Sequence, residues 1–277
     1  MAVDLHLHSY FSADGTLSPE DLAAYFHDGD VAALTDHETL GGAQRFVTAA
    51  EARGVRAIIG VEWFLARGDG HLLTYFREVS EDAETFVLSR RKREIEANWK
   101  AARALADLFP GFLSPNEILE HHPHPEGLIG VPALLAEVSP HVASRSEAID
   151  AVRKAQRSVR DRPEPLEATD LLARCATWGA LPVLAHPFRC RAGGDSQPDG
   201  GQVASLITRL EPLGLRGLEV DGWEVSESVR QVLYTFADLF NLVPAAGSDF
   251  HSPGKGMLPG QPSFDAQLFL AAFDKPD

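Results

Sequence analysis

The chain has 277 residues, of which 44% are hydrophobic, and its formal net charge is −15. This length and composition indicate one domain over residues 1–277, and the negative charge argues against charge-driven binding to duplex nucleic acid or to a membrane. The chain has only two cysteines, no signal-peptide pattern and no apolar run of about 18 residues, which favours a cytoplasmic protein.

Strands and helices alternate in the first third of the predicted structure. Ser18 followed by Pro19 predicts the start of a helix that runs to about His27. Strands are predicted at Ala2–Leu7, Val31–Thr35, Arg56–Val61 and His71–Phe76, and helices at Gly42–Arg53 and about Asp82–Leu108. The regular alternation indicates βα units.

The pattern changes after the long helix and returns near Pro165. The intervening stretch shows short helices and a loop rich in proline and histidine, so we predict a helical insertion at about 82–165. Beyond it, helices at Pro165–Trp178, Gln202–Leu213 and Val225–Phe240 alternate with strands at Leu181–Ala185, Arg216–Val220 and Leu242–Ala246. Strands separated by helices imply parallel pairing, and about seven of them predict a distorted α/β barrel.

Metal-ligand residue types gather at the predicted strand ends. They are His6, His8 and Asp14 after the first strand, His37 after the second, Glu62 after the third, His71 at the start of the fourth, His186 after the fifth, and Asp249 and His251 after the last. Glu219 and Asp221 follow another strand. Because strand ends of a parallel barrel share one face, these side chains are expected to form one site.

The spacing within this set favours metal binding. Residues i and i+2 of a strand point to the same side, so His6 and His8 are expected to act together, as are Asp249 and His251. Imidazole and carboxylate groups together suit Mn²⁺, Fe²⁺ or Zn²⁺, and this number of groups fits two or three ions. Each motif alone also has a structural interpretation: His37 could belong to a helix cap, and His186 could be a core histidine. The other five histidines, His27, His121, His122, His124 and His141, are predicted to lie outside the site.

The motifs resemble those of the PHP (polymerase and histidinol phosphatase) superfamily of metal-dependent phosphoesterases. The segments that carry the resemblance are Asp4–Ser9 with Ser12–Gly15, Leu34–Thr39, Gly60–Glu62, His71–Tyr75, Leu184–Pro187 and Gly247–His251. The resemblance implies a distorted (β/α)₇ barrel, similar to a TIM barrel. It also implies hydrolysis of a phosphate ester by a water molecule that the metal ions activate.

The resemblance further implies three metal positions. The first would use His6, His8, Glu62 and Asp249, the second Glu62, His71 and His186, and the third Asp14, His37 and His251. Asp249, Glu62 and His186 are the expected catalytic groups, and Mn²⁺ is the first choice of ion, with Fe²⁺ or Zn²⁺ as alternatives. Asp36 and Ser248 are expected to support ligands rather than to bind metal.

The substrate side of the site differs from the family pattern. The chain is nearest to small stand-alone members that act on nucleotides and short oligonucleotides, so the expected partner is a small phosphorylated substrate. Those members have an Arg-Pro-His stretch in the insertion, where this chain has Gly130–Ala133. Candidate phosphate-binding residues are Arg189, Arg191 and Lys255. The basic run Arg90–Arg93 could also bind phosphate, although a solvated helix face paired with Glu94 and Glu96 is the favoured interpretation.

Several alternatives remain at this stage. Histidinol phosphate is a second substrate candidate, and the barrel could also be a metal-binding module without activity. An amidohydrolase-type barrel shares the first His-x-His motif, but such enzymes commonly bridge their metals with a lysine, where this chain offers Glu62. An accessory domain of a DNA polymerase is disfavoured by the chain length.

Overall fold

Seven strands form the centre of the molecule. The computed structural model describes residues 1–189, 199–254 and 256–275. The strands are β1 (Val3–Leu7), β2 (Val31–Leu34), β3 (Arg56–Phe64), β4 (His71–Phe76), β5 (Leu181–Ala185), β6 (Gly217–Gly222) and β7 (Val243–Gly247). They pair in chain order from β1 to β7. The predicted seven-stranded α/β barrel is thereby confirmed.

The two edge strands, β1 and β7, meet and nearly close the barrel. The amide of Asp249 donates to the carbonyl oxygen of His6 at 2.9 Å, and the amide of His8 donates to that of Phe250 at 3.0 Å. A Cβ atom on Gly247 would lie 2.2 Å from the Cβ of His6, so only glycine allows this approach. The closure therefore places the ligand-type residues after β7 beside those of β1.

Strand β4 corrects the prediction of an all-parallel barrel. It pairs antiparallel with both β3 and β5, whereas the other strand pairs are parallel. The short turn from Leu65 to Gly70 joins β3 directly to β4, and only antiparallel strands can be joined by so short a connection. Because β4 runs antiparallel to its neighbours, its first residue, His71, lies at the face of the barrel that carries the site.

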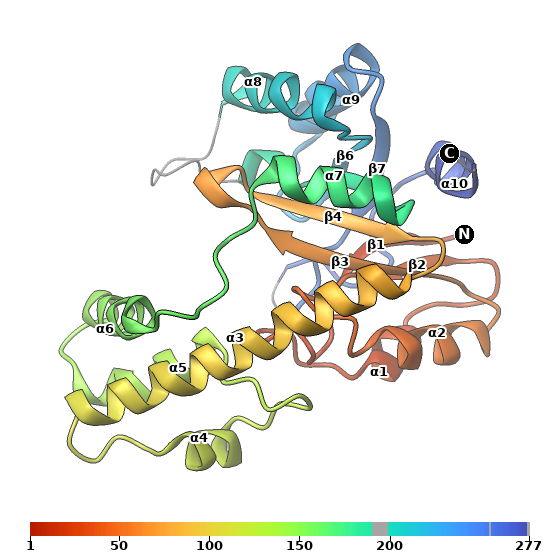
Figure 1. Ribbon diagram of the computed structural model, residues 1–277. Helices are drawn as coiled ribbons and strands as arrows, with labels where there is room; N and C mark the ends of the chain where they lie inside the picture. The colour runs from red at the N-terminus through yellow and green to blue at the C-terminus, as the bar shows by residue number, and fades with distance from the viewer. Residues whose placement is uncertain (190–198, 255, 276–277) are drawn as a thin grey trace.

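Helices cover the barrel and extend to one side of it (Figure 1). They are α1 (Pro19–Ala23), α2 (Ala43–Glu51), α3 (Glu81–Leu108), α4 (Pro115–His121), α5 (Val131–Val138), α6 (Arg145–Ser158), α7 (Ala168–Trp178), α8 (Gly200–Leu210), α9 (Glu227–Leu239) and α10 (Gln267–Asp274). Short 3₁₀ turns lie at Ala66–Gly68, Ser139–His141, Pro187–Arg189 and Glu211–Leu213. Within the described part of the chain, no helix has the length and apolar composition that crossing a membrane requires.

The first helix starts as predicted but is shorter. The Ser18 side chain accepts from the amide of Asp21 at 3.0 Å and caps the helix. The helix ends at Ala23 rather than near His27, because the next turn has a bond from the amide of Tyr25 to Leu22, which is three residues back.

The barrel interior and the outer layer bury separate apolar clusters. Leu5, Ala33 and Val183 belong to the inner cluster, where the Tyr75 hydroxyl donates to the carbonyl of Leu5 at 2.8 Å. Outside the sheet, α7, α8 and α9 pack on β5 and β6 through a cluster that includes Trp178. These two layers give the strand ends a rigid base.

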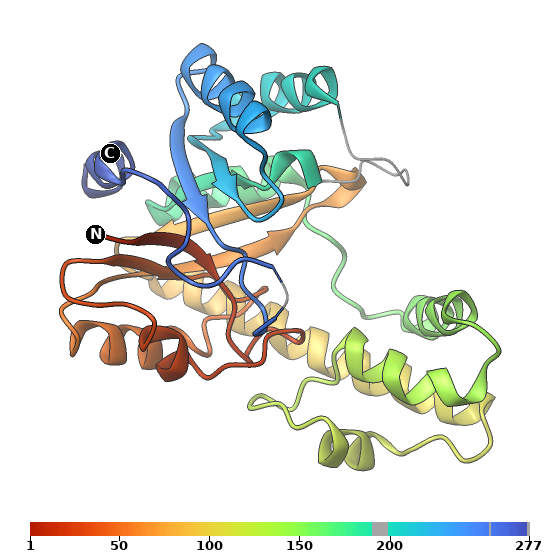
Figure 2. The same cartoon turned by 180° about the vertical axis from the view of Figure 1, so that it is seen from behind.

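Helices α3 to α6, residues 81–158, form what we call the helical unit. Figures 1 and 2 show α4, α5 and α6 gathered around the second half of α3, beside the barrel. The unit has its own apolar core, which includes Leu105, Ile118, Leu134 and Val152. From α6 the chain returns to the barrel, where the amide of Ala66 donates to the carbonyl of Leu166 at 2.8 Å.

Candidate metal centre

The structure brings the nine predicted metal ligands together in one cluster at the face of the barrel. We call this set the metal cluster: His6, His8, Asp14, His37, Glu62, His71, His186, Asp249 and His251. Within it, three groups of side chains each hold their donor atoms within 4.8 Å of one another.

The first group is fully buried and combines two imidazoles with two carboxylates. The Nε2 atoms of His6 and His8 each lie 3.1 Å from Glu62 Oε2. They lie 3.5 Å and 3.4 Å from Asp249 Oδ1. This is the set predicted for the first metal position.

The second group uses the other oxygen of the same glutamate. His71 Nδ1 lies 2.7 Å and His186 Nε2 lies 3.0 Å from Glu62 Oε1. Glu62 therefore faces the first group with one carboxylate oxygen and the second group with the other. A carboxylate in this position can bridge two cations.

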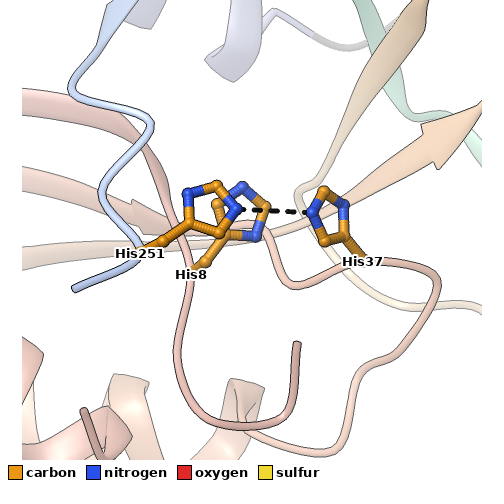
Figure 3. Close-up of side chains that lie close together, drawn as sticks. All are labelled: His8, His37 and His251. Atoms are coloured by element: carbon orange, nitrogen blue, oxygen red, sulfur yellow. Dashed lines mark hydrogen bonds between the residues drawn. The ribbon is translucent and has the colours of Figure 1, made fainter. Parts of the chain in front are cut away.

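The third group contains His8, His37 and His251 (Figure 3). The Nε2 atoms of His37 and His251 are 3.5 Å apart. The carboxylate of Asp14 lies 3.7 Å from His37 Nε2 and 3.5 Å from His251 Nε2. The structure thus places the three residues predicted for the third position together and adds the His8 ring, which stacks on His251.

Local backbone conformation aims two of these side chains. His186 and Asp249 have φ angles of 25° and 51°, in the left-handed region that non-glycine residues rarely adopt. His186 directly follows β5, and Asp249 is the second residue after β7, at the points where the chain turns away from the sheet. Strained residues of this kind are retained where they hold a functional group in place.

The cluster leaves several buried polar atoms without a hydrogen-bond partner. Among the described residues, none bonds to His6 Nε2, His8 Nε2, His37 Nδ1 or Glu62 Oε2. Leaving a buried polar atom unpaired costs about 1–3 kcal/mol, so a group of them in one place requires a ligand. Imidazole nitrogens and carboxylate oxygens are the donor set of Mn²⁺, Fe²⁺ and Zn²⁺, and the cluster therefore fits divalent cations.

The Nδ1 atoms of His6 and His8 have hydrogen-bond partners, and this leaves the Nε2 atoms of the same rings to bind a cation. His6 Nδ1 donates to Glu219 Oε1 at 3.1 Å. The Ser12 hydroxyl donates to Asp36 Oδ1 at 2.8 Å, so its oxygen accepts from His8 Nδ1 at 3.0 Å. With a proton fixed on Nδ1, each ring presents Nε2 to the cluster, where a cation can replace the second proton, as in metal-binding histidines.

The electrostatics of the cluster favour positive charge. Burial disfavours the protonated form of His8, but the neighbouring carboxylates of Asp249 and Glu62 raise its pKa to about 9. Burial raises the pKa of the Glu62 carboxyl, yet the charges of His6, His37 and His71 hold it well below its ordinary value. The carboxylates thus attract cations to this place, whether these are protons or metal ions.

Two acidic residues support the cluster from outside it. Asp36 accepts from the Ser9 amide and from the hydroxyls of Ser9 and Ser12, at 2.7 to 2.8 Å. Glu219, which was expected at the same face but in none of the three metal positions, accepts from His6 Nδ1 and, at 2.6 Å, from the His186 amide. Its position at a strand end was the available sequence signal.

Of the predicted phosphate-binding residues, only Arg189 lies in the described part of the chain. It donates to Asp249 Oδ2 at 2.5 Å, and its guanidinium carbon lies 4.6 Å from the centre of the Trp223 ring. Arg191 and Lys255 lie outside the described residues. Arg189 therefore contacts a member of the metal cluster directly.

The solvated-face interpretation of the basic run is wrong for Arg90 and Arg91. Both are buried, with 5% and 4% of their surface exposed. Arg90 forms two bonds to the Glu38 carboxylate, at 2.8 and 3.0 Å. Arg91 binds Glu126 at 2.8 Å as well as Glu94 at 3.0 Å. This first half of α3 packs on the barrel, so its arginines point at partners far away in the sequence.

The five histidines predicted to lie outside the site belong to none of the three groups among the described residues. His121 and His122 contact Glu137, and the His141 ring packs against Phe109 and Phe112. His124 is half-buried and contacts Arg91 and the carbonyl of Phe11.

Two cavities adjoin the metal cluster. The larger, of about 610 Å³, lies between the barrel face and the helical unit and includes Asp14 and His37 in its wall. The smaller, of about 320 Å³, includes His71, His186 and Arg189. The Phe64 side chain, from a residue that is 40% exposed, lines both of them. A substrate therefore has space on two sides of the cluster.

Comparisons with known proteins agree on one family. The sequence pattern of the PHP domain matches residues 4–157, more than half of the chain. A 5'-3' exoribonuclease of Haemophilus influenzae is 28% identical over 265 residues, which cover 90% of each chain. A 3',5'-nucleoside bisphosphate phosphatase of Chromobacterium violaceum is 26% identical over 276 residues, which cover 92% of this chain and 88% of the relative.

Solved structures share the fold. A protein of Bifidobacterium adolescentis, described as a metal-dependent phosphoesterase, superposes with a TM-score of 0.73 at 23% identity, over 99% of this chain and 96% of that one. A Chromobacterium violaceum protein described as an amidohydrolase with bound sulfate and no metal gives 0.71 at 22% identity, with the same coverage. At these identities the likeness concerns the fold.

Proposed function

The chain belongs to the PHP domain family and is a metal-dependent hydrolase of phosphate esters, and we propose that its substrate is a nucleotide or a short oligonucleotide. The observation that carries the proposal is the set of unpartnered imidazole and carboxylate atoms that converge beside a cavity of nucleotide size. Sites for small ligands commonly have volumes of about 300–1,000 Å³.

The three groups of the metal cluster would hold two to three divalent ions. His6, His8, Glu62 and Asp249 would hold one ion, and Glu62 with His71 and His186 a second. Asp14, His37 and His251 would contribute to a third. The mixed nitrogen and oxygen donors favour Mn²⁺, with Fe²⁺ or Zn²⁺ as alternatives. When bound, such ions lower the pKa of a water molecule and neutralise charge on the phosphoryl oxygens.

The chain's own residues organise this chemistry. Glu62 faces both groups with its two oxygens, so it would fix the separation between neighbouring cations. Arg189 holds Asp249 through a 2.5 Å bond, and Glu219 orients His6 and the backbone of His186. We therefore assign the catalytic function to Asp249, Glu62 and His186 together with the ions.

A water molecule is the proposed nucleophile. The hydroxyls of Ser9 and Ser12, two serines beside the cluster, both donate to Asp36, and this engages the protons that a serine nucleophile would have to lose. Trapping a phosphorylated form of the protein during turnover would contradict direct attack by water.

The nucleotide preference has support from the cavity as well as from the relatives. Phe64 offers an exposed ring that contacts the rings of His37 and His71, at centroid distances of 4.8 and 4.6 Å. Aromatic rings beside a phosphate site are suited to stacking on a base. The cavity is too small for a duplex, and the net charge of −15 also disfavours one.

The test is a panel of esters assayed with Mn²⁺ and a measured metal content. We expect turnover of mononucleotides, nucleoside bisphosphates or short RNA, weak turnover of histidinol phosphate, and none of duplex DNA. Preferred turnover of histidinol phosphate would select the second substrate candidate. Bound metal without turnover of any ester would instead indicate a binding module, and activity on amides or lactones alone would indicate amidohydrolase chemistry.

A further inference from the structure

The larger cavity contains two arginines that have no carboxylate partner. Exposed Arg157 and half-buried Arg162 line it, and their side chains form no hydrogen bond or ion pair with residues 1–189, 199–254 or 256–275. We propose that Arg157 and Arg162 form a subsite for a second phosphate group of the substrate. The inference deepens the proposed function and depends on it, because it assigns a doubly phosphorylated substrate to the same site.

The other charged groups in this cavity wall are already compensated. Arg90 is paired with Glu38, and Arg91 with Glu94 and Glu126. Asp14 and His37 belong to the metal cluster. This leaves Arg157, Arg162 and the exposed Glu164, so the wall formed by α6 and the segment after it has excess positive charge. In a chain with a net charge of −15, uncompensated arginines beside a catalytic cluster favour an anionic ligand there.

The backbone around these arginines is held in place. Gln156, next to Arg157, is buried and its amide donates to Asn98 of α3 at 3.3 Å. Beyond Arg162, Pro163 is buried and the amide of Leu166 donates to the carbonyl of Phe64 at 3.3 Å. Leu166 is four positions after Arg162, so their Cα atoms are at most about 14 Å apart. Arg162 is thus tied to the end of β3, beside the metal cluster.

The other described cationic side chains of this cavity wall already have carboxylate partners, so they are not available to bind a phosphate. Gly130, Val131 and Pro132 line the cavity with no charged side chain. Guanidinium groups bind phosphate through two parallel hydrogen bonds, and two of them suit a phosphate with two negative charges. One phosphate would lie at the metal cluster while the other contacts these arginines.

The test compares ligands with one and two phosphates. Phosphonate analogues, in which CH₂ replaces each ester oxygen, are bound to the purified protein by calorimetry: one of adenosine 3'-phosphate and one of adenosine 3',5'-bisphosphate. The double variant Arg157→Gln with Arg162→Gln is expected to bind the bisphosphonate about 10- to 100-fold more weakly, and the monophosphonate within about 2-fold of the original affinity. The control is Arg160→Gln, an exposed arginine outside the cavity wall, which should change neither.

Each outcome separates this subsite from the proposed function. Equal loss for both analogues, or no loss for either, would refute the subsite even if the protein hydrolyses nucleotides. A loss confined to the bisphosphonate would support it even if no ester is turned over, and in that case only the proposed activity would fail. A 5'-phosphorylated dinucleotide, tested as substrate of the same variants, then distinguishes a terminal second phosphate from one within a chain. A larger loss of kcat/KM for the dinucleotide than for the bisphosphate would select the oligonucleotide.

Discussion

The metal cluster and the helical unit border the same cavity but use their charged residues in opposite ways. In the cluster, buried atoms such as His6 Nε2 and Glu62 Oε2 have no hydrogen-bond partner among the described residues. In the first turns of α3, the buried guanidinium groups of Arg90 and Arg91 are each matched with carboxylates. Buried charged groups without a hydrogen-bond partner indicate a ligand site, whereas buried ion pairs hold two parts of the fold together.

The largest effect is expected from Glu62→Gln, which removes the charge shared by two groups of the metal cluster. We expect phosphate-ester turnover to fall by about 10³-fold, together with the bound metal content. Steady-state kinetics and elemental analysis measure both quantities. The control is Glu96→Gln, an exposed residue of α3. Retention of metal and activity in Glu62→Gln would contradict the bridging role.

A smaller effect is expected when the matched pair at the helical unit is broken. Arg90→Met leaves the buried Glu38 without its partner, and the free energy of unfolding should fall by about 3 kcal/mol. Adding Glu38→Gln should restore part of the loss, because no buried charge then remains. Chemical denaturation measures the cycle, and Arg93→Met on the exposed side of α3 is the control. Equal stability of Arg90→Met and Arg93→Met would show that the buried pair of Arg90 and Glu38 does not hold the helical unit on the barrel.

An intermediate case is Glu219, which supports the metal cluster without belonging to it. In Glu219→Gln, one of the two oxygens that accept from His6 Nδ1 and the His186 amide becomes a donor group. Metal affinity should therefore weaken about 10-fold, while kcat at saturating metal recovers. Titrations with metal, in which activity is measured at each concentration, separate the change in metal affinity from the change in kcat. A kcat that stays low at every metal concentration would instead make Glu219 a catalytic group.

The smallest effect concerns the helical unit alone. Ser144 caps α6 by accepting from the Glu147 amide at 3.2 Å, so Ser144→Ala should cost about 1 kcal/mol of stability. Metal content should not change, because no ligand of the cluster comes from this unit. Ser144→Asp, which keeps a capping oxygen, should retain the stability. Loss of metal from Ser144→Ala would show that the two regions are coupled more closely than the structure indicates.

The sequence predicted the two regions unequally well, for a physical reason. The residues of the metal cluster follow strands, and the position of a strand end is a local property that apolar runs and i, i+2 spacing reveal. The pairing of Arg91 with Glu94 follows from local spacing, whereas Glu38 and Glu126, the other partners of Arg90 and Arg91, lie 52 and 35 residues away in the chain. Their positions depend on how α3 packs on the barrel, which no local pattern encodes.

The direction of β4 shows the same limit. The turn containing Gly68 and Gly70 was visible in the sequence, but alternation of strands and helices in the rest of the chain favoured parallel pairing throughout. The length of the connection between β3 and β4 decides the direction. His71 was nevertheless expected in the site. It is the first residue of β4, and because this strand is antiparallel, its first residue lies at the face that carries the site.

Anomalous diffraction at the manganese edge, from crystals grown with Mn²⁺, tests the central claim most directly. We expect one peak between His6, His8, Glu62 and Asp249, and a second between Glu62, His71 and His186. A third peak should lie beside His37 and His251 when the cluster is filled. A protein that turns over phosphate esters but shows no peak within the metal cluster would contradict the account.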